Sequence, residues 1–142
     1  MEKRETKEIP TIILCVTGSI SASSTPRLLS LLSDQYHIIV ILSKGAAEFV
    51  DTKTILETCN TLHYICIIGN LELIYSGDND KSNEYFSEIA KKAVLLAIIP
   101  LSANSLGKIV SGLSDDPIVI FVAISIFRAI CAEYGMDIIN RL

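Results

Sequence analysis

Three short polar segments hold the residues whose types and spacing could bind a ligand, and each of them follows an apolar run. In the first, over residues 16–21, Gly18 would let the backbone approach a ligand closely, and Ser19 and Ser21 would offer hydroxyl groups. The start of a following helix would attract a phosphate. A plain strand-to-helix turn with serine caps explains the same residues equally well. Because the segment lacks the G-x-G-x-x-G pattern, it does not indicate NAD.

The second and third segments cover residues 43–49 and 100–108. Ser43 again places a hydroxyl at the end of an apolar run, although this segment alone is more typical of a solvated turn. In the third segment, small side chains would let a planar ring lie against the backbone. Ser102, Asn104 and Ser105 could hydrogen-bond to ring heteroatoms, while helix capping by Ser102 accounts for part of the same pattern. The run of small polar residues between two apolar blocks favours a ligand.

The elements that must position these segments alternate between strand and helix. Strands are expected at residues 11–16, 37–42, 61–68, 94–99, 117–123 and 136–139, and helices at 26–33, 51–57, 84–92, 102–111 and 126–134. The apolar runs 93–101 and 118–127 are interpreted as strands buried on both faces of a parallel sheet. This alternation predicts the α/β class, as a three-layer flavodoxin-like or Rossmann-like parallel sheet with helices on both faces. Ligands of such sheets bind beyond the carboxyl ends of the strands, where all three polar segments would lie.

Composition excludes several other classes of protein. The chain has 142 residues, of which 50% are hydrophobic, and its net charge of −4 argues against a nucleic-acid surface. We expect a charged leader over residues 1–9 and one domain over residues 10–142. The longest apolar run has about ten residues, half of the roughly twenty that span a bilayer. The four cysteines fit no metal-binding spacing, and together with the absence of a signal-peptide pattern they indicate a cytoplasmic protein without a metal site.

Four blocks of sequence, taken together and in order, resemble a known family. They cover residues 14–20, 43–50, 100–109 and 112–116, and they are similar to the flavin-binding cysteine decarboxylases, including phosphopantothenoylcysteine decarboxylase and the halotolerance proteins. The resemblance implies an FMN cofactor and a homotrimer or a mixed trimer with a related subunit. It also implies a set of cofactor-binding residues: Gly18, Ser19, Ser43, Ser102, Ala103, Asn104 and Ser105.

The chain departs from the family pattern where the chemistry is expected. Phe86 stands at the position of the family's active-site histidine, and a phenylalanine cannot transfer a proton. Residues 117–123, interpreted as a strand, directly follow Asp116, so we expect the family's connecting helix to be deleted. Ser125 is then the approximate counterpart of the substrate-binding asparagine. The sequence ends at Leu142, before the family's flap with its catalytic cysteine. No catalytic residue is therefore assigned.

These departures favour a catalytically degenerate FMN-binding subunit or regulator, with a protein partner and without enzymatic activity of its own. One alternative is an active decarboxylase of the coenzyme A pathway that a partner chain completes. The other is a flavin-free binding or structural protein that reuses the fold. If the chain forms an oligomer, we expect Phe86 and residues 118–127 near the subunit contact.

Overall fold

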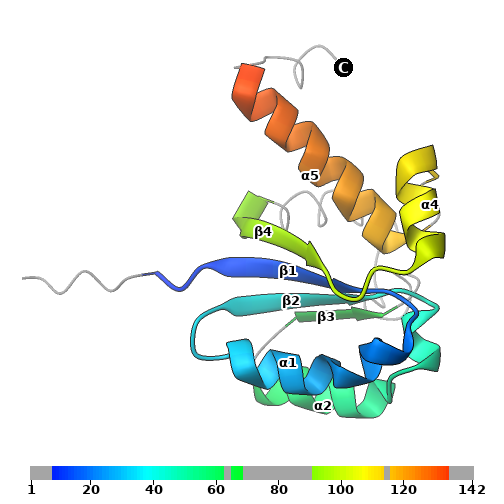
Figure 1. Ribbon diagram of the computed structural model, residues 1–142. Coiled ribbons are helices and arrows are strands. Elements are labelled where there is room, and N and C mark those ends of the chain that lie inside the picture. The colour runs from blue at the N-terminus through cyan, green and yellow to red at the C-terminus, as the bar shows by residue number, and fades with distance from the viewer. Residues whose placement is uncertain (1–7, 63–64, 69–90, 114–115, 135–142) are drawn as a thin grey trace, which may run out of the picture.

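Four parallel strands form the central sheet of the protein, which a computed structural model describes over residues 8–62, 65–68, 91–113 and 116–134 (Figure 1). The strands are β1 (Thr11–Val16), β2 (His37–Leu42), β3 (Ile65–Ile68) and β4 (Ala93–Ile98), in the spatial order β3-β2-β1-β4. Every pairing is parallel. The strands therefore end at a common edge, and the expected α/β class with a parallel sheet is confirmed.

Helices cover both faces of this sheet. The short 3-10 helix η1 (Ile20–Ser24), α1 (Thr25–Leu32), the 3-10 helix η2 (Ala46–Glu48) and α2 (Thr52–Thr61) follow β1 and β2, whereas α4 (Ala103–Ser111) and α5 (Pro117–Tyr134) follow β4. In Figure 1, α1 and α2 lie below the sheet and α5 lies above it. This arrangement is the expected three-layer architecture.

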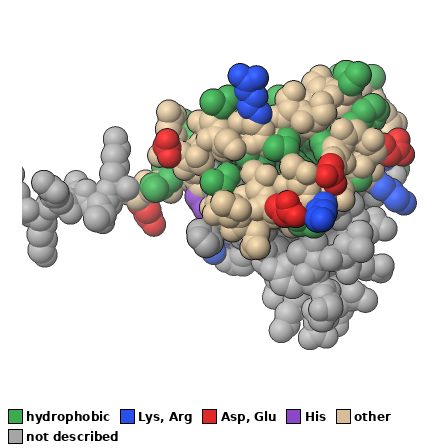
Figure 2. All heavy atoms as spheres, turned by 90° about the horizontal axis from the view of Figure 1, so that it is seen from below, with side chains coloured by type: hydrophobic (Ala, Val, Ile, Leu, Met, Phe, Trp, Pro, Cys, Tyr) green, Lys and Arg blue, Asp and Glu red, His purple; other side chains and the backbone are tan. Residues whose placement is uncertain are grey.

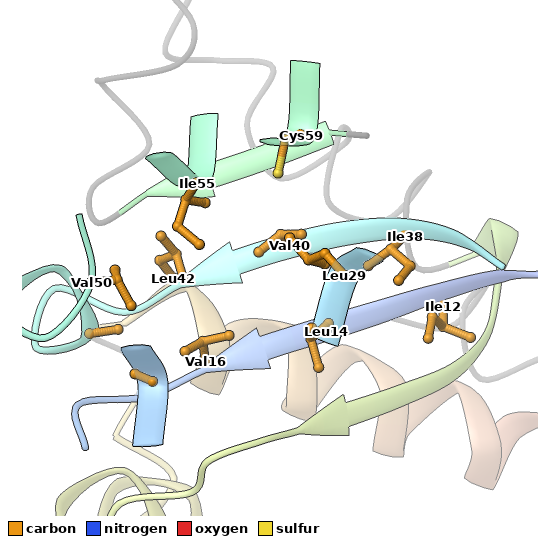
Figure 3. Packing of buried hydrophobic residues seen from close by; sticks show 12 residues of the cluster. Ile12, Leu14, Val16, Leu29, Ile38, Val40, Leu42, Val50, Ile55 and Cys59 are labelled. Carbon is orange, nitrogen blue, oxygen red and sulfur yellow. The ribbon is translucent and has the colours of Figure 1, made fainter. Parts of the chain in front are cut away.

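The two faces of β1 and β2 pack into two separate cores. Alternate residues of these strands point toward α1 and α2, as Figure 3 shows for Leu14 and Val40, which belong to a buried cluster with Leu29 and Ile55. The intervening residues pack against α5 on the other face, where Phe121 is fully buried. Because both faces are covered, β1 and β2 are apolar at nearly every position.

The strand expected over residues 117–123 is wrong: this stretch is the first part of the 18-residue helix α5. An apolar run without periodicity does not distinguish a buried strand from a buried helix. The local start signals are those of a helix, because Pro117 occupies its first position and the Asp116 Oδ1 accepts a hydrogen bond from the Ile118 amide at 2.8 Å. The connecting helix that the sequence suggested was deleted is therefore present.

Other predicted elements differ less from those in the structure. Thr61 ends α2, so the strand expected from that residue begins only at Ile65. β4 lies at the edge of the described sheet, and its Val94 and Leu95 side chains are 70% and 56% exposed, so this strand is not buried on both faces as expected. Residues 1–7, most of the expected helix 84–92 and the expected strand 136–139 lie outside the described residues.

No described helix is long and apolar enough to cross a membrane. On the described part of the face formed by α1 and α2, Figure 2 shows basic side chains that stand apart from one another, with acidic side chains among them. The described part of this face therefore carries no continuous basic patch.

Candidate functional site

The loops that follow β1, β2 and β4 enclose a pocket at the carboxyl edge of the sheet. Its volume is about 470 Å³, which lies within the range of roughly 300–1,000 Å³ that is typical of small-molecule sites. The lining residues come from all three loops and from the start of α5: Gly18, Ser43, Lys44, Gly45, Glu48, Phe49, Ser102, Asn104, Ser105, Lys108 and Asp116. The three polar segments of the sequence thus meet in space, as their positions after parallel strands predicted.

Five of the seven predicted cofactor-binding residues line this pocket, and two do not. The lining residues are Gly18, Ser43, Ser102, Asn104 and Ser105. The Ser19 Oγ instead lies 3.5 Å from the Ser21 Oγ, while its carbonyl accepts a hydrogen bond from the amide of η1 residue Ala22. Ala103 is exposed and contributes the first amide of α4.

Gly18 is required by contact with another part of the backbone. A Cβ atom at this position would lie 3.0 Å from the carbonyl carbon of Gly45, closer than ordinary packing allows. The loops after β1 and β2 therefore approach each other so closely at Gly18 that a side chain there would require one of them to shift. The sequence suggested close approach to a ligand at this glycine, and the structure shows close approach to Gly45.

Thr17 joins the first loop to the third. Its side chain is fully buried, and its Oγ1 donates to the Pro100 carbonyl at 2.6 Å and accepts from the Ser102 amide, also at 2.6 Å. The Thr17 amide donates to the same carbonyl at 3.2 Å. This residue therefore fixes Ser102 relative to Gly18. Thr17 lies within the first polar segment, but the sequence assigns it no role, because a partner 85 positions away leaves no local signal.

The serine hydroxyls of the pocket also stabilise the local backbone. The Ser43 Oγ accepts a hydrogen bond from the Ala46 amide at 3.1 Å. The Ser102 Oγ accepts from the Ser105 amide at 3.2 Å, which confirms Ser102 as the N-cap of α4, and it donates to the Ser105 Oγ at 3.1 Å. The acceptor bond leaves the Ser43 hydroxyl hydrogen available, because a hydroxyl is both donor and acceptor.

Charged residues at the pocket wall come with both signs. Lys44 and Lys108 are basic, and Glu48 and Asp116 are acidic. Asp116 also lies close enough to Cys15 to act on it: burial, with a smaller contribution from the Asp116 charge, raises the pKa of the Cys15 thiol to about 12. Sequence reasoning did not single out these charged residues. For Lys108 a signal existed, because the i, i+3 and i, i+4 spacings from Ser105 and Asn104 put all three on one side of α4.

The described lining of the pocket includes neither the expected counterparts of the family's catalytic and substrate-binding residues nor the described histidine. Phe86 and His63 lie outside the described residues. Ser125 lies within α5 and not at the end of a strand, so its interpretation as the counterpart of a substrate-binding asparagine loses its structural basis. His37 begins β2, at the edge of the sheet opposite the pocket. Within the described ranges, no group of three or more acidic, histidine or cysteine side chains could hold a metal ion.

Comparison with known proteins gives one consistent group of relatives. The chain is 29% identical over 115 residues to the coenzyme A biosynthesis bifunctional protein CoaBC of Borreliella burgdorferi, which covers 80% of this chain and 27% of that protein. It is 27% identical over 115 residues to phosphopantothenoylcysteine decarboxylase HAL3b of Glycine max, covering 75% of this chain and 47% of the relative. The chain thus spans less than half the length of these two relatives.

Solved structures share the fold. The FMN-binding protein AtHal3 superposes with a TM-score of 0.65 at 24% identity, over 83% of this chain and 60% of that one. The FMN-dependent cysteine decarboxylase SpaF gives a TM-score of 0.65 at 19% identity, over 82% and 63%. The model of the Flavoprotein family matches residues 1–129, which is most of the sequence. The chain therefore belongs to the Flavoprotein family.

Proposed function

We propose that the protein binds FMN in the pocket formed by the loops after β1, β2 and β4. The observation that carries this proposal is that five residues chosen from the sequence line one pocket of suitable volume. The names of the related proteins support the choice of cofactor, because AtHal3 is described as an FMN-binding protein and SpaF as FMN-dependent.

The chemistry of the lining fits a phosphorylated planar ligand. The amides of Ala103 and Asn104 are the first two of α4, and amides at these positions have no carbonyl partner within their helix, so they suit a phosphate or a carbonyl group. Lys44 and Lys108 would add positive charge, and Phe49, which is 44% exposed, would offer an aromatic surface to a ring. Bound FMN would supply a two-electron acceptor at this site.

The finer proposal is that this chain is a catalytically degenerate subunit or regulator. Proton transfer requires a titratable group within hydrogen-bonding reach of the substrate. Of the two histidines, His37 lies at the opposite edge of the sheet, and the sequence places Phe86 where the family has its histidine. The acids and lysines that line the pocket are titratable, but its described lining includes no histidine, so it supports cofactor binding better than the family's histidine-dependent decarboxylation.

Titration of the flavin-free protein with FMN, followed by flavin fluorescence, tests the binding proposal. Asn104→Ala removes an exposed side chain that lines the pocket, so it should weaken FMN about threefold to tenfold, as expected for the loss of one hydrogen bond. Asn60→Ala is the matched control, because Asn60 is exposed on α2 and does not line this pocket. Equal affinities of the two variants, or no binding by the parent protein, would contradict the proposed site.

An activity assay separates the three interpretations of the sequence. The degenerate subunit should bind FMN and release no carbon dioxide from phosphopantothenoylcysteine. Release that depends on the pocket residues would support an active decarboxylase, and release that appears only with a related chain would support completion by a partner. A protein that binds no flavin would support the structural role.

We also propose that the protein assembles as a homotrimer or as a mixed trimer with a related subunit, in the cytoplasm. Leu106 and Val110 lie one turn apart on α4 and are 47% and 79% exposed, and Leu113, which follows the helix, is 53% exposed. Exposed apolar side chains that lie close together favour an interface. By contrast, Ile118 and Phe121, which were expected near the subunit contact, are fully buried in this chain's own core.

Sedimentation velocity at several concentrations tests the assembly. The parent protein should sediment as a multiple of the 15.5 kDa chain, and Val110→Lys should shift it toward the monomer. Ser30→Lys, at an exposed position of α1, is the control and should leave the assembly unchanged. A single-chain mass for the parent protein at every concentration would contradict the proposal.

A further inference from the structure

Two cysteine thiols meet on the face of the sheet covered by α1 and α2. Cys59 belongs to α2 and Cys66 to β3, and the Cys66 side chain forms a hydrogen bond with the Cys59 sulfur. Cys59 is buried in the core cluster, and Cys66 packs against that cluster. Figure 3 shows the sulfur of Cys59 beside the ribbon of β3. The contact between helix and strand therefore holds these two thiols together.

A second pocket opens onto this pair. Its volume is about 340 Å³, and it is lined by Leu56, Glu57, Cys59, Asn60 and Cys66. None of these residues lines the proposed FMN pocket. A small molecule that enters this pocket can thus contact both sulfur-bearing residues without disturbing the flavin site.

The two thiols differ in their ability to lose a proton. The hydrogen bond from Cys66 lowers the pKa of Cys59, opposed by a smaller effect of burial. The same hydrogen bond, together with burial, raises the pKa of the Cys66 thiol. The attacking species in thiol chemistry is the thiolate, so Cys59 is the nucleophile of the pair and Cys66 is the second thiol. Cys15 is completely buried and has a raised pKa.

We propose that Cys59 and Cys66 form a dithiol site that a small hydroperoxide oxidises to an intrachain disulfide. The Cys59 sulfur attacks a peroxide oxygen, the O–O bond breaks, and Cys59 becomes a sulfenic acid while the other oxygen leaves as water or an alcohol. The Cys66 sulfur then attacks the sulfenic sulfur, the S–O bond breaks, and water leaves with the remaining proton. Both cysteines are oxidised by one electron each, and the peroxide is the two-electron acceptor.

Mass spectrometry of the whole chain after treatment with hydrogen peroxide tests this site. Trypsin cleaves after Lys53 and next after Lys81, so Cys59 and Cys66 share one peptide, while Cys15 and Cys131 lie in others. We expect this shared peptide to lose two hydrogen atoms and both sites of alkylation, and dithiothreitol should restore them. The peptide containing Cys15 should stay fully reduced. Retention of both alkylation sites, or equally fast oxidation of Cys15, would overturn the proposal.

Two variants test the order of the steps. In Cys66→Ala the second thiol is absent, so a sulfenic acid should accumulate at Cys59 and be trapped by dimedone, and the parent protein should give little of this adduct. Cys59→Ala should give neither the adduct nor the disulfide. Because a variant could alter folding, the rate for the parent protein is also compared with and without urea. Disulfide formation that is as fast in urea would show that the fold does not create the site.

Discussion

Replacement of Thr17 by valine tests whether the first and third loops of the pocket depend on one buried hydroxyl. Valine keeps the branched shape, but it cannot donate to the Pro100 carbonyl or accept from the Ser102 amide. The Pro100 carbonyl keeps a partner, because the Thr17 amide also donates to it at 3.2 Å. The Ser102 amide loses the acceptor that holds it at 2.6 Å.

The expected loss of stability follows from these two bonds. A buried donor left without a partner costs about 1–3 kcal/mol, and the second hydrogen bond contributes about 1 kcal/mol. Thr17→Val should therefore lower the free energy of unfolding by about 2–4 kcal/mol, a large part of the roughly 5–15 kcal/mol of an ordinary domain. Urea unfolding followed by circular dichroism measures this difference, and the slope of the transition should not change. FMN affinity should fall as well, since Ser102 lines the pocket.

Thr25→Val is the matched control. Thr25 is also buried, and its Oγ1 donates at 2.6 Å to the Ala22 carbonyl, which also accepts from the Thr25 amide. Only one hydrogen bond is lost here and no amide is left without a partner, so this variant should lose about 1 kcal/mol and keep its FMN affinity. Equal losses in the two variants would show that the bridge between the loops adds nothing beyond an ordinary hydrogen bond.

Three further results are expected. Gly18→Ala should destabilise the protein more than Gly45→Ala, because the added Cβ would meet backbone at 3.0 Å in the first case and at 3.6 Å in the second; equal melting temperatures would refute this. Ser102→Ala removes the cap of α4 and should cost about 1 kcal/mol in urea unfolding. The pKa of the Cys15 thiol is raised from 9.0 to about 12 by burial and by the Asp116 charge, so the unfolded chain loses this proton first. The stability that the protonated Cys15 thiol gives the folded state is therefore complete below pH 9 and is lost as the pH rises toward 12. Cys15→Ala should reduce this pH dependence of the free energy of unfolding.

The sequence predicted best the elements whose ends carry their own chemical signals. The bounds of β1 and β2 agree with the expected ranges, because β-branched apolar runs there end at polar residues. The helix α4 was expected over residues 102–111, and the structure has Ser102 as N-cap and Gly112 with a φ of 68° as its left-handed end. Such signals are local, so a single sequence contains them.

The predictions were wrong or incomplete for residues whose structure depends on contacts with distant parts of the chain. Residues 117–123 are apolar on every side, so their pattern does not show whether they pair with a strand or pack as a helix, and the capping contact of Asp116 was not weighed. β4 was expected inside the sheet, but only the sheet order shows that Val94 and Leu95 lie at its described edge. Thr17 and Gly45 depend on partners in other loops for the same reason.

Most residues of the pocket motif also have a structural role, so the motif by itself does not show that the chain binds flavin. Thr17 joins two loops by hydrogen bonds, and Ser43 and Ser102 each accept a hydrogen bond from the amide three residues further on. Gly18 packs closely against Gly45. Selection for stability alone would therefore keep much of the motif, even in a chain that no longer binds flavin. The residues that discriminate between a retained fold and a retained function are those that line the pocket without supporting the backbone. Asn104 is such a residue, exposed at the pocket wall, and a loss of FMN affinity without a loss of stability at this position would be a direct sign of function.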